Sequence, residues 1–195
     1  MYRYKEPGTY TVSATVTSGE GISRTLTAKV TATKGYEPPE YKGYGNLAYL
    51  GIITCNVGQP KGSGSKDIEI IRDGKITRTN LGQYDTFFYR GDPHEEYIGY
   101  VFSEAYSFDK VVFTEGMQFD NGGWFENGTL RIEALIDGSW KKLDVVSEPE
   151  YPNGNKQSDF GANFETYTFA FEPVKASGIR LIGSAGGSMH FISVA

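Results

Sequence analysis

The chain has 195 residues, of which 38% are hydrophobic and 22% charged, and its formal net charge is −5. Such a composition is typical of a globular protein with one large domain or two smaller ones. The negative charge argues against sequence-independent binding to nucleic acid or anionic membranes, which requires a positive surface. No apolar run approaches the roughly 20 residues of a membrane span, so we expect no membrane insertion.

Residue usage favours strands joined by turns. The sequence contains 14 Tyr, 12 Phe and 25 Gly. Aromatic and β-branched residues suit a half-buried pleated surface, and glycine suits the turns between strands. We therefore expect an all-β protein.

The first predicted element is a β-hairpin. Residues 9–17 and 25–33 each alternate strictly between apolar and mostly hydroxyl-bearing side chains, and the turn SGEG lies between them. Alternation with period 2 across a glycine-containing turn is a hairpin signal. A hairpin alone is marginally stable in water. We expect it to pack on the rest of the chain or to self-associate with a second copy.

This N-terminal stretch resembles part of a known repeat. Tyr2 and Tyr4 precede the motif EPGTYTV at residues 6–12, and a Thr- and Val-rich strand follows. The pattern is similar to the C-terminal half of a polycystic-kidney-disease (PKD) repeat, an immunoglobulin-like module. The resemblance implies an Ig-like fragment over residues 1–34. Residues 35–44 then form a linker, which Pro38-Pro39 makes semi-stiff and unsuited to a ladder strand.

Residues 45–195 form the second predicted unit, a series of short strands and glycine-rich loops. Asp137-Gly138 joins two apolar segments and is a strong signal for a tight hairpin. Regularly spaced short strands with turn signals predict a sandwich or barrel. The single cysteine, Cys55, lies in the strand-like run GIITCNV, where a thiol behaves as a small hydrophobe. The predicted strands are residues 97–103, 110–116, 129–137, 166–173, 178–185 and 190–195.

The order of motifs in this unit is similar to that of a discoidin domain, also called a coagulation-factor 5/8 type C domain. Bacterial members of that family include the family 32 carbohydrate-binding modules. The motifs that carry the resemblance are Asn46-Leu47-Ala48, Asp73-Gly74, Asp85-Thr86-Phe87, Tyr97-Ile98-Gly99-Tyr100, Lys110-Val111-Val112-Phe113, Asp137-Gly138-Ser139-Trp140, Gly178-Ile179-Arg180-Leu181 and residues 190–195.

The resemblance implies a β-sandwich jelly roll whose ligand site lies on loops at one end. It also implies non-catalytic sugar recognition, usually as an appendage of a secreted or cell-surface glycoside hydrolase. We therefore expect a glycan partner and a secreted or surface location. An alternative is a cell-surface adhesion or assembly module that binds protein through the hairpin edge or through exposed aromatic side chains.

A sugar site needs one or two aromatic faces and a few polar groups on a rigid scaffold, because a pyranose has apolar faces and a rim of hydroxyls. The candidate loops are 56–66, 84–97, 117–128, 150–165 and 184–190. The resemblance gives polar roles to an arginine and a histidine. The candidate ligand-binding residues are Trp124, Asn121, Arg90, His94, Tyr89, Tyr151, Phe160 and Asn163.

The stretch FDNGGWFENG at residues 119–128 places two aromatic side chains in a polar loop. Leaving a large apolar side chain in water costs roughly 1.5–3 kcal/mol. Trp124 is either a stacking platform for a ligand or a cap on the open end of the sandwich. We favour the platform, with Phe125 anchoring the loop to the core.

The resemblance also implies a structural calcium ion. A hard cation requires six to eight oxygen ligands, several of them from carboxylates. Asp73, Asp85 and Thr86 match the expected ligand types, so Ca²⁺ is the one predicted cofactor.

Catalysis is not expected. Glycosidases hold two carboxylates about 5–10 Å apart in a cleft. Glu95 and Glu96 are adjacent and would point to opposite faces of a strand, and Glu148 and Glu150 flank a proline. The glycine-rich segment 58–66 lacks the Gly-Lys-Ser/Thr ending of a phosphate-binding loop, which favours a flexible loop.

Overall fold

A computed structural model describes residues 8–19, 21, 23–32, 45–89, 92–152 and 164–195. The chain divides into two compact units, Met1–Gly45 and Asn46–Ala195. Residues 35–44, including Pro38 and Pro39, and the tyrosines at positions 2 and 4 lie outside the described residues. No helix among the described residues is long and apolar enough to cross a membrane.

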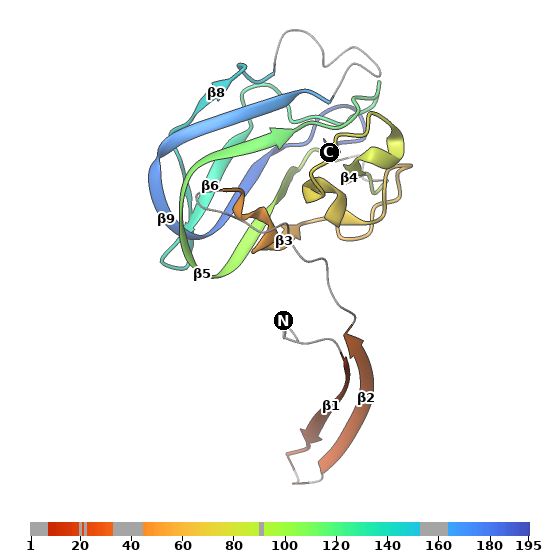
Figure 1. The fold of residues 1–195 in the computed structure, drawn as a ribbon. Coiled ribbons are helices and arrows are strands. Elements are labelled where there is room, and N and C mark those ends of the chain that lie inside the picture. The colour runs from red at the N-terminus through yellow and green to blue at the C-terminus, as the bar shows by residue number, and fades with distance from the viewer. Residues whose placement is uncertain (1–7, 20, 22, 33–44, 90–91, 153–163) are drawn as a thin grey trace. The chain divides into compact units, whose positions relative to one another are not determined.

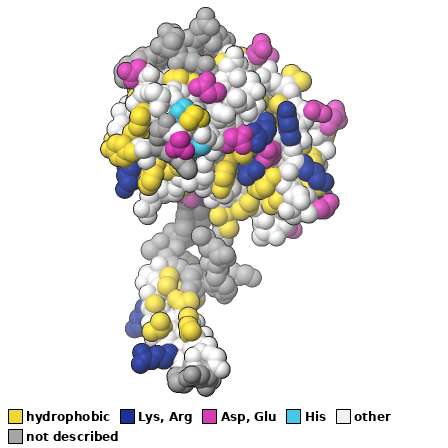
Figure 2. All heavy atoms as spheres, turned by 180° about the vertical axis from the view of Figure 1, so that it is seen from behind, with side chains coloured by type: hydrophobic (Ala, Val, Ile, Leu, Met, Phe, Trp, Pro, Cys, Tyr) yellow, Lys and Arg dark blue, Asp and Glu magenta, His cyan; other side chains and the backbone are white. Residues whose placement is uncertain are grey.

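The first unit contains the predicted hairpin. Strands β1 (Gly8–Thr17) and β2 (Ser23–Ala32) pair antiparallel, with Val12 opposite Ala28. The alternation places apolar side chains on one face and hydroxyls on the other, where Thr15 and Thr25 bond across the strands at 2.8 Å. The apolar face is uncovered within this unit: Val16 is 65% exposed and Leu26 71% exposed (Figure 2).

The second unit is a β-sandwich built from one curled six-stranded sheet and a two-stranded ribbon (Figure 1). The sheet has the order β3-β5-β9-β6-β7, and β8 pairs with β9. Its strands are β3 (Ile52–Cys55), β5 (Glu95–Thr114), β6 (Arg131–Ile136), β7 (Ser139–Lys142), β8 (Val146–Glu148) and β9 (Thr166–Ser184). The ribbon pairs β4 (Tyr84–Asp85) with β10 (Ser193–Val194). Three short 3₁₀ helices, η1 (Leu47–Tyr49), η2 (Ile68–Arg72) and η3 (Asn80–Gly82), lie in the connections before β4.

Two pairs of predicted strands are each a single long strand. β5 joins residues 97–103 with 110–116, and β9 joins 166–173 with 178–185. The register between β5 and β9 shifts twice, between Val101 and Tyr106 and between Phe108 and Lys110. Bulges of this kind bend a strand and increase its twist. The same two strands therefore continue around the curve of the sandwich.

The predicted hairpin at Asp137-Gly138 is confirmed. Ile136 pairs with Ser139, so two residues form the turn between β6 and β7. Asp137 has φ +51° and Gly138 has φ +77°. Positive φ at both central positions is the type I′ geometry that Asp-Gly favours.

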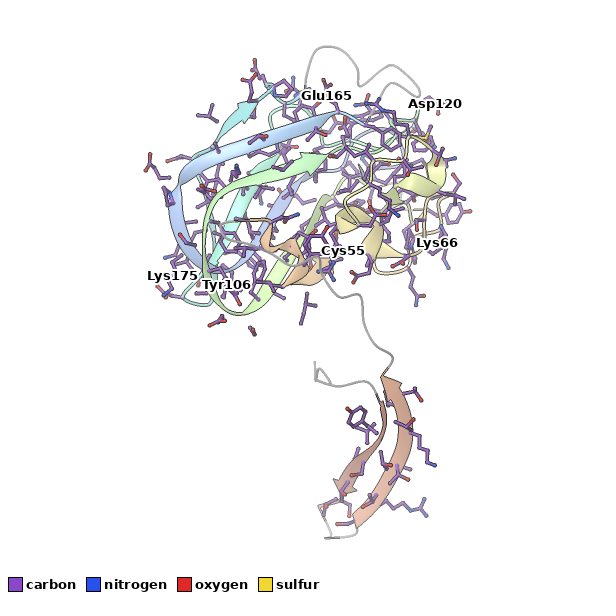
Figure 3. The ribbon with its side chains drawn as sticks, in the orientation of Figure 1. Cys55, Lys66, Tyr106, Asp120, Glu165 and Lys175 are labelled. Carbon is purple, nitrogen blue, oxygen red and sulfur yellow. The ribbon has the colours of Figure 1, made fainter. Side chains whose placement is uncertain are left out.

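Aromatic side chains fill the core between the layers. Phe113 and Tyr167 stack at 6.2 Å, and Tyr151 meets the Tyr167 ring edge-on at 4.8 Å. The sandwich has two ends: Lys66 and Asp120 lie near one, and Tyr106 and Lys175 lie near the other (Figure 3). The end that carries Lys66 and Asp120 holds the loops considered next.

Candidate functional site

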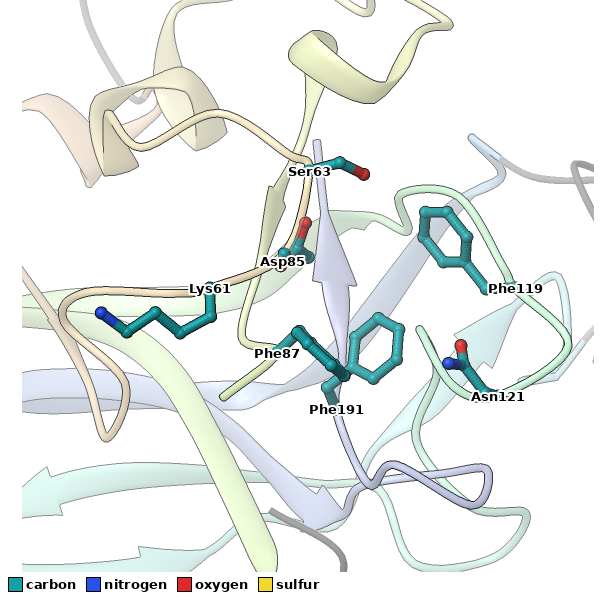
Figure 4. Close-up of a pocket in the computed structure, with 8 residues that line it drawn as sticks. Lys61, Ser63, Asp85, Phe87, Phe119, Asn121 and Phe191 are labelled. Atoms are coloured by element: carbon teal, nitrogen blue, oxygen red, sulfur yellow. The ribbon is translucent and has the colours of Figure 1, made fainter. Parts of the chain in front are cut away.

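Four separate chain segments enclose a cavity of about 280 Å³ at this loop end (Figure 4). The four segments are the 56–66 loop, β4 with the residues directly after it, the 117–128 loop, and the segment before β10 that contains Phe191. Three of them come from loops that the sequence marked as candidates. The lining residues are Lys61, Gly62, Ser63, Asp85, Phe87, Phe119, Asn121 and Phe191.

Three phenyl rings form the apolar side of the cavity. Phe87 and Phe191 meet edge to face with ring centroids 5.3 Å apart, and Phe119 lies 5.8 Å from Phe191. Edge-to-face pairs add roughly 0.5–1.5 kcal/mol beyond burial, so they hold one another in place. The result is a preformed apolar wall rather than a set of free side chains.

Hydrogen bonds fix the glycine-rich wall of the cavity. The Lys61 N–H donates to the Phe87 carbonyl at 2.7 Å, and the Ser65 N–H donates to the Gln83 carbonyl at 2.8 Å. A Cβ at Gly62 or at Gly64 would overlap with the Asp85 carboxylate. The glycines therefore allow this loop to approach β4 closely. Hydrogen bonds from the N–H groups of Lys61, Gly64 and Ser65 hold the loop, which was expected to be flexible.

Asp85 is the charged group beneath this wall. Its side chain is buried, and Oδ2 accepts a hydrogen bond from the Gly64 N–H at 2.7 Å. Oδ1 makes no hydrogen bond of good geometry with any described residue. Burial raises the pKa of Asp85, whereas the Gly64 N–H, the Lys66 ammonium and the Phe87 N–H lower it.

Asn121 supplies the neutral polar group of the cavity. Its carbonyl accepts a hydrogen bond from the Met189 N–H at 2.9 Å, which fixes the backbone at this point. Its side-chain amide forms no hydrogen bond with a described residue and lines the cavity. An amide offers two donors and an acceptor, which suits the hydroxyl rim of a sugar. Of the predicted ligand-binding residues that the structure describes, Asn121 is the one that lines the cavity.

Trp124 and Phe125 both point into the protein. Trp124 is 9% exposed and Phe125 is 0% exposed. The Gly186 N–H donates to the Trp124 carbonyl at 2.8 Å, and a Cβ at Gly186 would overlap with the indole. This burial favours the capping alternative for Trp124 over the platform, and it agrees with the anchoring role expected of Phe125.

Three other predicted ligand-binding residues are described, and they lie in different places. Tyr151 is part of the core network, where its Oη donates to Glu115 Oε1 at 3.0 Å, and burial raises its pKa. His94 Nε2 lies 3.0 Å from Glu96 Oε1, and its ring is 6.2 Å from that of His190. Tyr89 is 72% exposed and meets the Phe87 ring edge-on at 4.9 Å. Arg90, Phe160 and Asn163 lie outside the described residues.

Two of the three predicted calcium ligands are engaged in hydrogen bonds within the protein. Asp73 Oδ1 accepts a hydrogen bond from the Lys75 N–H at 2.7 Å in an exposed turn. The Thr86 hydroxyl donates to Glu96 and accepts from the Ile192 N–H, so its proton and one of its two lone pairs are engaged. Within the described ranges, no three Asp, Glu, His or Cys side chains are placed to hold a metal ion. Calcium stays a prediction: Asp73 and Thr86 are engaged in these hydrogen bonds, whereas Asp85 Oδ1 has no partner among the described residues.

Calcium is therefore expected to leave thermal stability unchanged. An ion at a hundred times its dissociation constant would add about 2.7 kcal/mol to the free energy of unfolding. Because Asp73 and Thr86 are bonded within the protein, we expect equal melting temperatures in excess Ca²⁺ and in excess chelator. Calorimetry in the two buffers measures this. A rise of several degrees with Ca²⁺, but not with Mg²⁺, would show that an ion binds after all.

Comparisons with known proteins bear on the fold. No family model matches this sequence, and no curated protein matches it. Among solved structures, CpGH89CBM32-5 from Clostridium perfringens, in complex with GalNAc-β-1,3-galactose, is 17% identical, with a TM-score of 0.52 over 76% of this chain and 93% of that one. The Streptococcus pneumoniae β-galactosidase BgaA is 13% identical, with a TM-score of 0.55 over 75% and 89%.

The chain has the fold of a family 32 carbohydrate-binding module. A further such module, from C. perfringens NanJ in complex with galactose, is 17% identical, with a TM-score of 0.48 over 73% of this chain and 89% of that one. The predicted discoidin-like β-sandwich is thus confirmed for the second unit. The PKD-like nature of the hairpin stays a prediction.

Several residues of the cavity were missed in the sequence. Phe119 lies in the same loop as Trp124, but Trp124, the larger aromatic residue, was predicted to stack on the ligand. Phe87 and Phe191 are far apart in the sequence, and they meet only because Asp85 pairs with Ser193 across β4 and β10. No sequence pattern marks Lys61 as a site residue, because its position depends on the hydrogen bond from its N–H to the Phe87 carbonyl.

Proposed function

We propose that this chain is a non-catalytic glycan-binding module that holds a sugar in the cavity at the loop end of its sandwich. The observation that carries the proposal is the cavity itself. It combines three preformed phenyl faces with the side-chain amide of Asn121, which bonds to no described residue, and with the glycine-rich wall that begins at Lys61. Apolar faces with a few fixed polar groups are what a pyranose requires.

The likeness to solved carbohydrate-binding modules suggests which larger protein this module belongs to. Modules with this fold include parts of glycoside hydrolases, as the C. perfringens module indicates. We infer that this chain targets such an enzyme to its glycan and is secreted or displayed on a cell surface. The catalytic step would then belong to another domain. GalNAc-β-1,3-galactose and galactose, which the solved modules bind, are the first glycans to test.

Two substitutions test the cavity. Phe119→Ala removes one aromatic wall, and Asn121→Ala removes the free amide, so each is expected to weaken glycan binding by about tenfold or more. Both side chains are partly exposed, which should leave the fold intact. A glycan array followed by calorimetric titration of the best glycan measures the loss.

Asn127→Ala is the matched control, because Asn127 lies in the same loop but is exposed and does not line the cavity. It should bind as the wild type does. Equal binding by the wild type and both cavity variants would place the glycan elsewhere on the molecule. If the folded wild type binds no glycan, the proposed function fails.

One observation favours the second candidate, a protein-binding assembly module. The hairpin has an uncovered apolar face, to which Val12 and Val30 also contribute. Among the described residues, β1 and β2 pair with no third strand, so the edges of the hairpin can pair with another chain. An assembly module would ignore the array and would associate more strongly as its concentration rises, which sedimentation velocity detects.

A further inference from the structure

Tyr89 has an unusual position beside the cavity. It lies just beyond the cavity wall, and its ring meets the edge of the Phe87 ring at 4.9 Å. Phe87 in turn contacts Phe191, and Phe191 contacts Phe119. The four rings form one continuous series that begins inside the cavity and ends outside it at Tyr89.

The exposure of Tyr89 has no explanation in the fold. The side chain is 72% exposed, whereas Phe87, to which it is nearly adjacent, is partly buried in the cavity wall. Among the described residues, the hydroxyl of Tyr89 has no hydrogen-bond partner. A ring that is mostly exposed contributes little to the packing of the core.

The backbone at Tyr89 is also strained. Its φ is +55°, in the left-handed region that glycine and asparagine adopt more readily than an aromatic residue. Such conformations cost free energy, persist where the surroundings hold them, and cluster at ligand sites. A glycine here would relieve the strain. The presence of tyrosine therefore indicates that its ring has a use outside the fold.

The neighbouring rim provides polar groups for a ligand on this side. The Lys61 ammonium lies 5.8 Å from the centroid of the Phe88 ring, and Phe88 is 49% exposed. Lys61 also lines the cavity. A ligand that extends from the cavity to Phe88 would thus meet a cation able to donate to its hydroxyls.

We propose that Tyr89 forms a second sugar subsite, so that the site binds an oligosaccharide of at least two units. One unit occupies the cavity between Phe87, Phe119 and Asn121, and the next unit stacks on the ring of Tyr89. The inference rests on the proposed glycan-binding function. It adds that chain length, and not only the identity of one sugar, determines affinity.

The test measures affinity against glycan length. Ladders of one to four units of β-1,4-linked glucose, N-acetylglucosamine, glucosamine and galactose are titrated by calorimetry into the wild type, Tyr89→Gly, Tyr89→Phe and Val146→Ala. Val146 is the control for loss of an exposed apolar side chain, because it is 75% exposed on β8 and outside the cavity lining. Melting temperatures are measured for all four proteins.

For the ladder that binds, the wild type should gain roughly tenfold in affinity between one unit and two. Tyr89→Gly should lose that gain and keep the affinity for one unit. Tyr89→Phe and Val146→Ala should keep both. Because glycine tolerates positive φ, Tyr89→Gly should melt at the wild-type temperature or above it.

Other outcomes distinguish a failure of the Tyr89 subsite from a failure of the proposed glycan-binding function. A length-dependent gain that survives in Tyr89→Gly would overturn the Tyr89 subsite but leave the glycan-binding module in place. A marked drop in the melting temperature of Tyr89→Gly would show that the ring serves the fold, which also overturns the subsite. If the wild type binds no member of any ladder and no glycan on the array, both the subsite and the proposed function fail.

Discussion

Replacing Trp124 with alanine is expected to lower the free energy of unfolding by about 3–5 kcal/mol, the usual cost of deleting a buried large aromatic side chain. The indole is 9% exposed and packs so closely against Gly186 that no Cβ fits there. The adjacent Phe125 is fully buried and bridges to Ala185. Loss of the indole therefore opens a cavity beneath the loop at the end of the sandwich.

Urea denaturation measures this effect, and the chain offers a matched control. The other tryptophan, Trp140, is partly exposed on β7, with its ring 4.2 Å from the Arg180 guanidinium. Trp140→Ala should cost about 1 kcal/mol, since it removes an exposed cation–π contact and little core packing. A Trp124→Ala variant that keeps its stability but loses glycan binding would restore the platform interpretation.

The parts of the fold that were predicted correctly depend on neighbouring residues in the sequence. The hairpin of β1 and β2 follows from period-2 alternation on both sides of one turn. The Asp137-Gly138 turn follows from the two positive φ angles that this dipeptide accepts. In both cases the deciding contacts join residues that are close in the chain, so local chemistry is sufficient.

Other features depend on contacts between distant segments. The interruptions at residues 104–109 and 174–177 suggested separate strands, but bulges carry β5 and β9 through them. Trp124 sits among polar residues, and its sequence neighbours cannot reveal that Gly186 leaves space for the indole. The tertiary packing decides between cap and platform.

In the candidate site, too, local sequence predicts some features, and contacts between distant segments decide the others. The loops 56–66, 84–97 and 117–128 were identified because turn residues accumulate in them, and all three contribute to the cavity. Which side chains face inward depends on the pairing of β4 with β10, which brings Phe87 and Phe191 together. Sequence patterns therefore predicted three of the loops that form the cavity, and among the predicted site residues that the structure describes, Asn121 and Asp85 line it.

A second large loss of stability is expected for Glu96→Ala, again about 3–5 kcal/mol. Glu96 is 1% exposed on β5. Its Oε2 accepts a hydrogen bond from the Thr86 hydroxyl, and its Oε1 lies 3.0 Å from His94 Nε2. Alanine leaves the buried Thr86 hydroxyl and the partly buried His94 ring without this partner, and an unsatisfied buried group costs its full desolvation penalty.

The loss should extend to the cavity, because Thr86 connects Glu96 to the residue after Phe191. The Thr86 N–H donates to the Ile192 carbonyl, and the Ile192 N–H donates to the Thr86 hydroxyl, both at 2.9 Å. Without Glu96, the Thr86 hydroxyl loses its carboxylate acceptor and keeps only its contacts with Ile192, so the segment that positions Phe191 loses one of its constraints. Glycan affinity should therefore fall along with stability.

Glu96→Gln is the matched variant, and pH separates its charge effect from its packing. Burial raises the pKa of Glu96 above its ordinary value of 4.5, although Thr86 and His94 act to lower it. A carboxyl whose pKa is raised on folding binds more protons in the folded state than in the unfolded state. Its contribution to stability is therefore fully present below the unfolded pKa and is lost as pH rises through the folded pKa.

The wild type should consequently lose stability relative to Glu96→Gln as the pH rises from below 4.5, until Glu96 is ionised in the folded state. Urea denaturation of both proteins across this range measures the difference, in which groups common to the two proteins largely cancel. A difference that stays constant with pH would mean that the carboxyl ionises equally in the folded and unfolded states. A difference of the opposite sign would mean that the pairing with His94 outweighs burial, so that Glu96 acts as half of an ion pair and not as a desolvated acid.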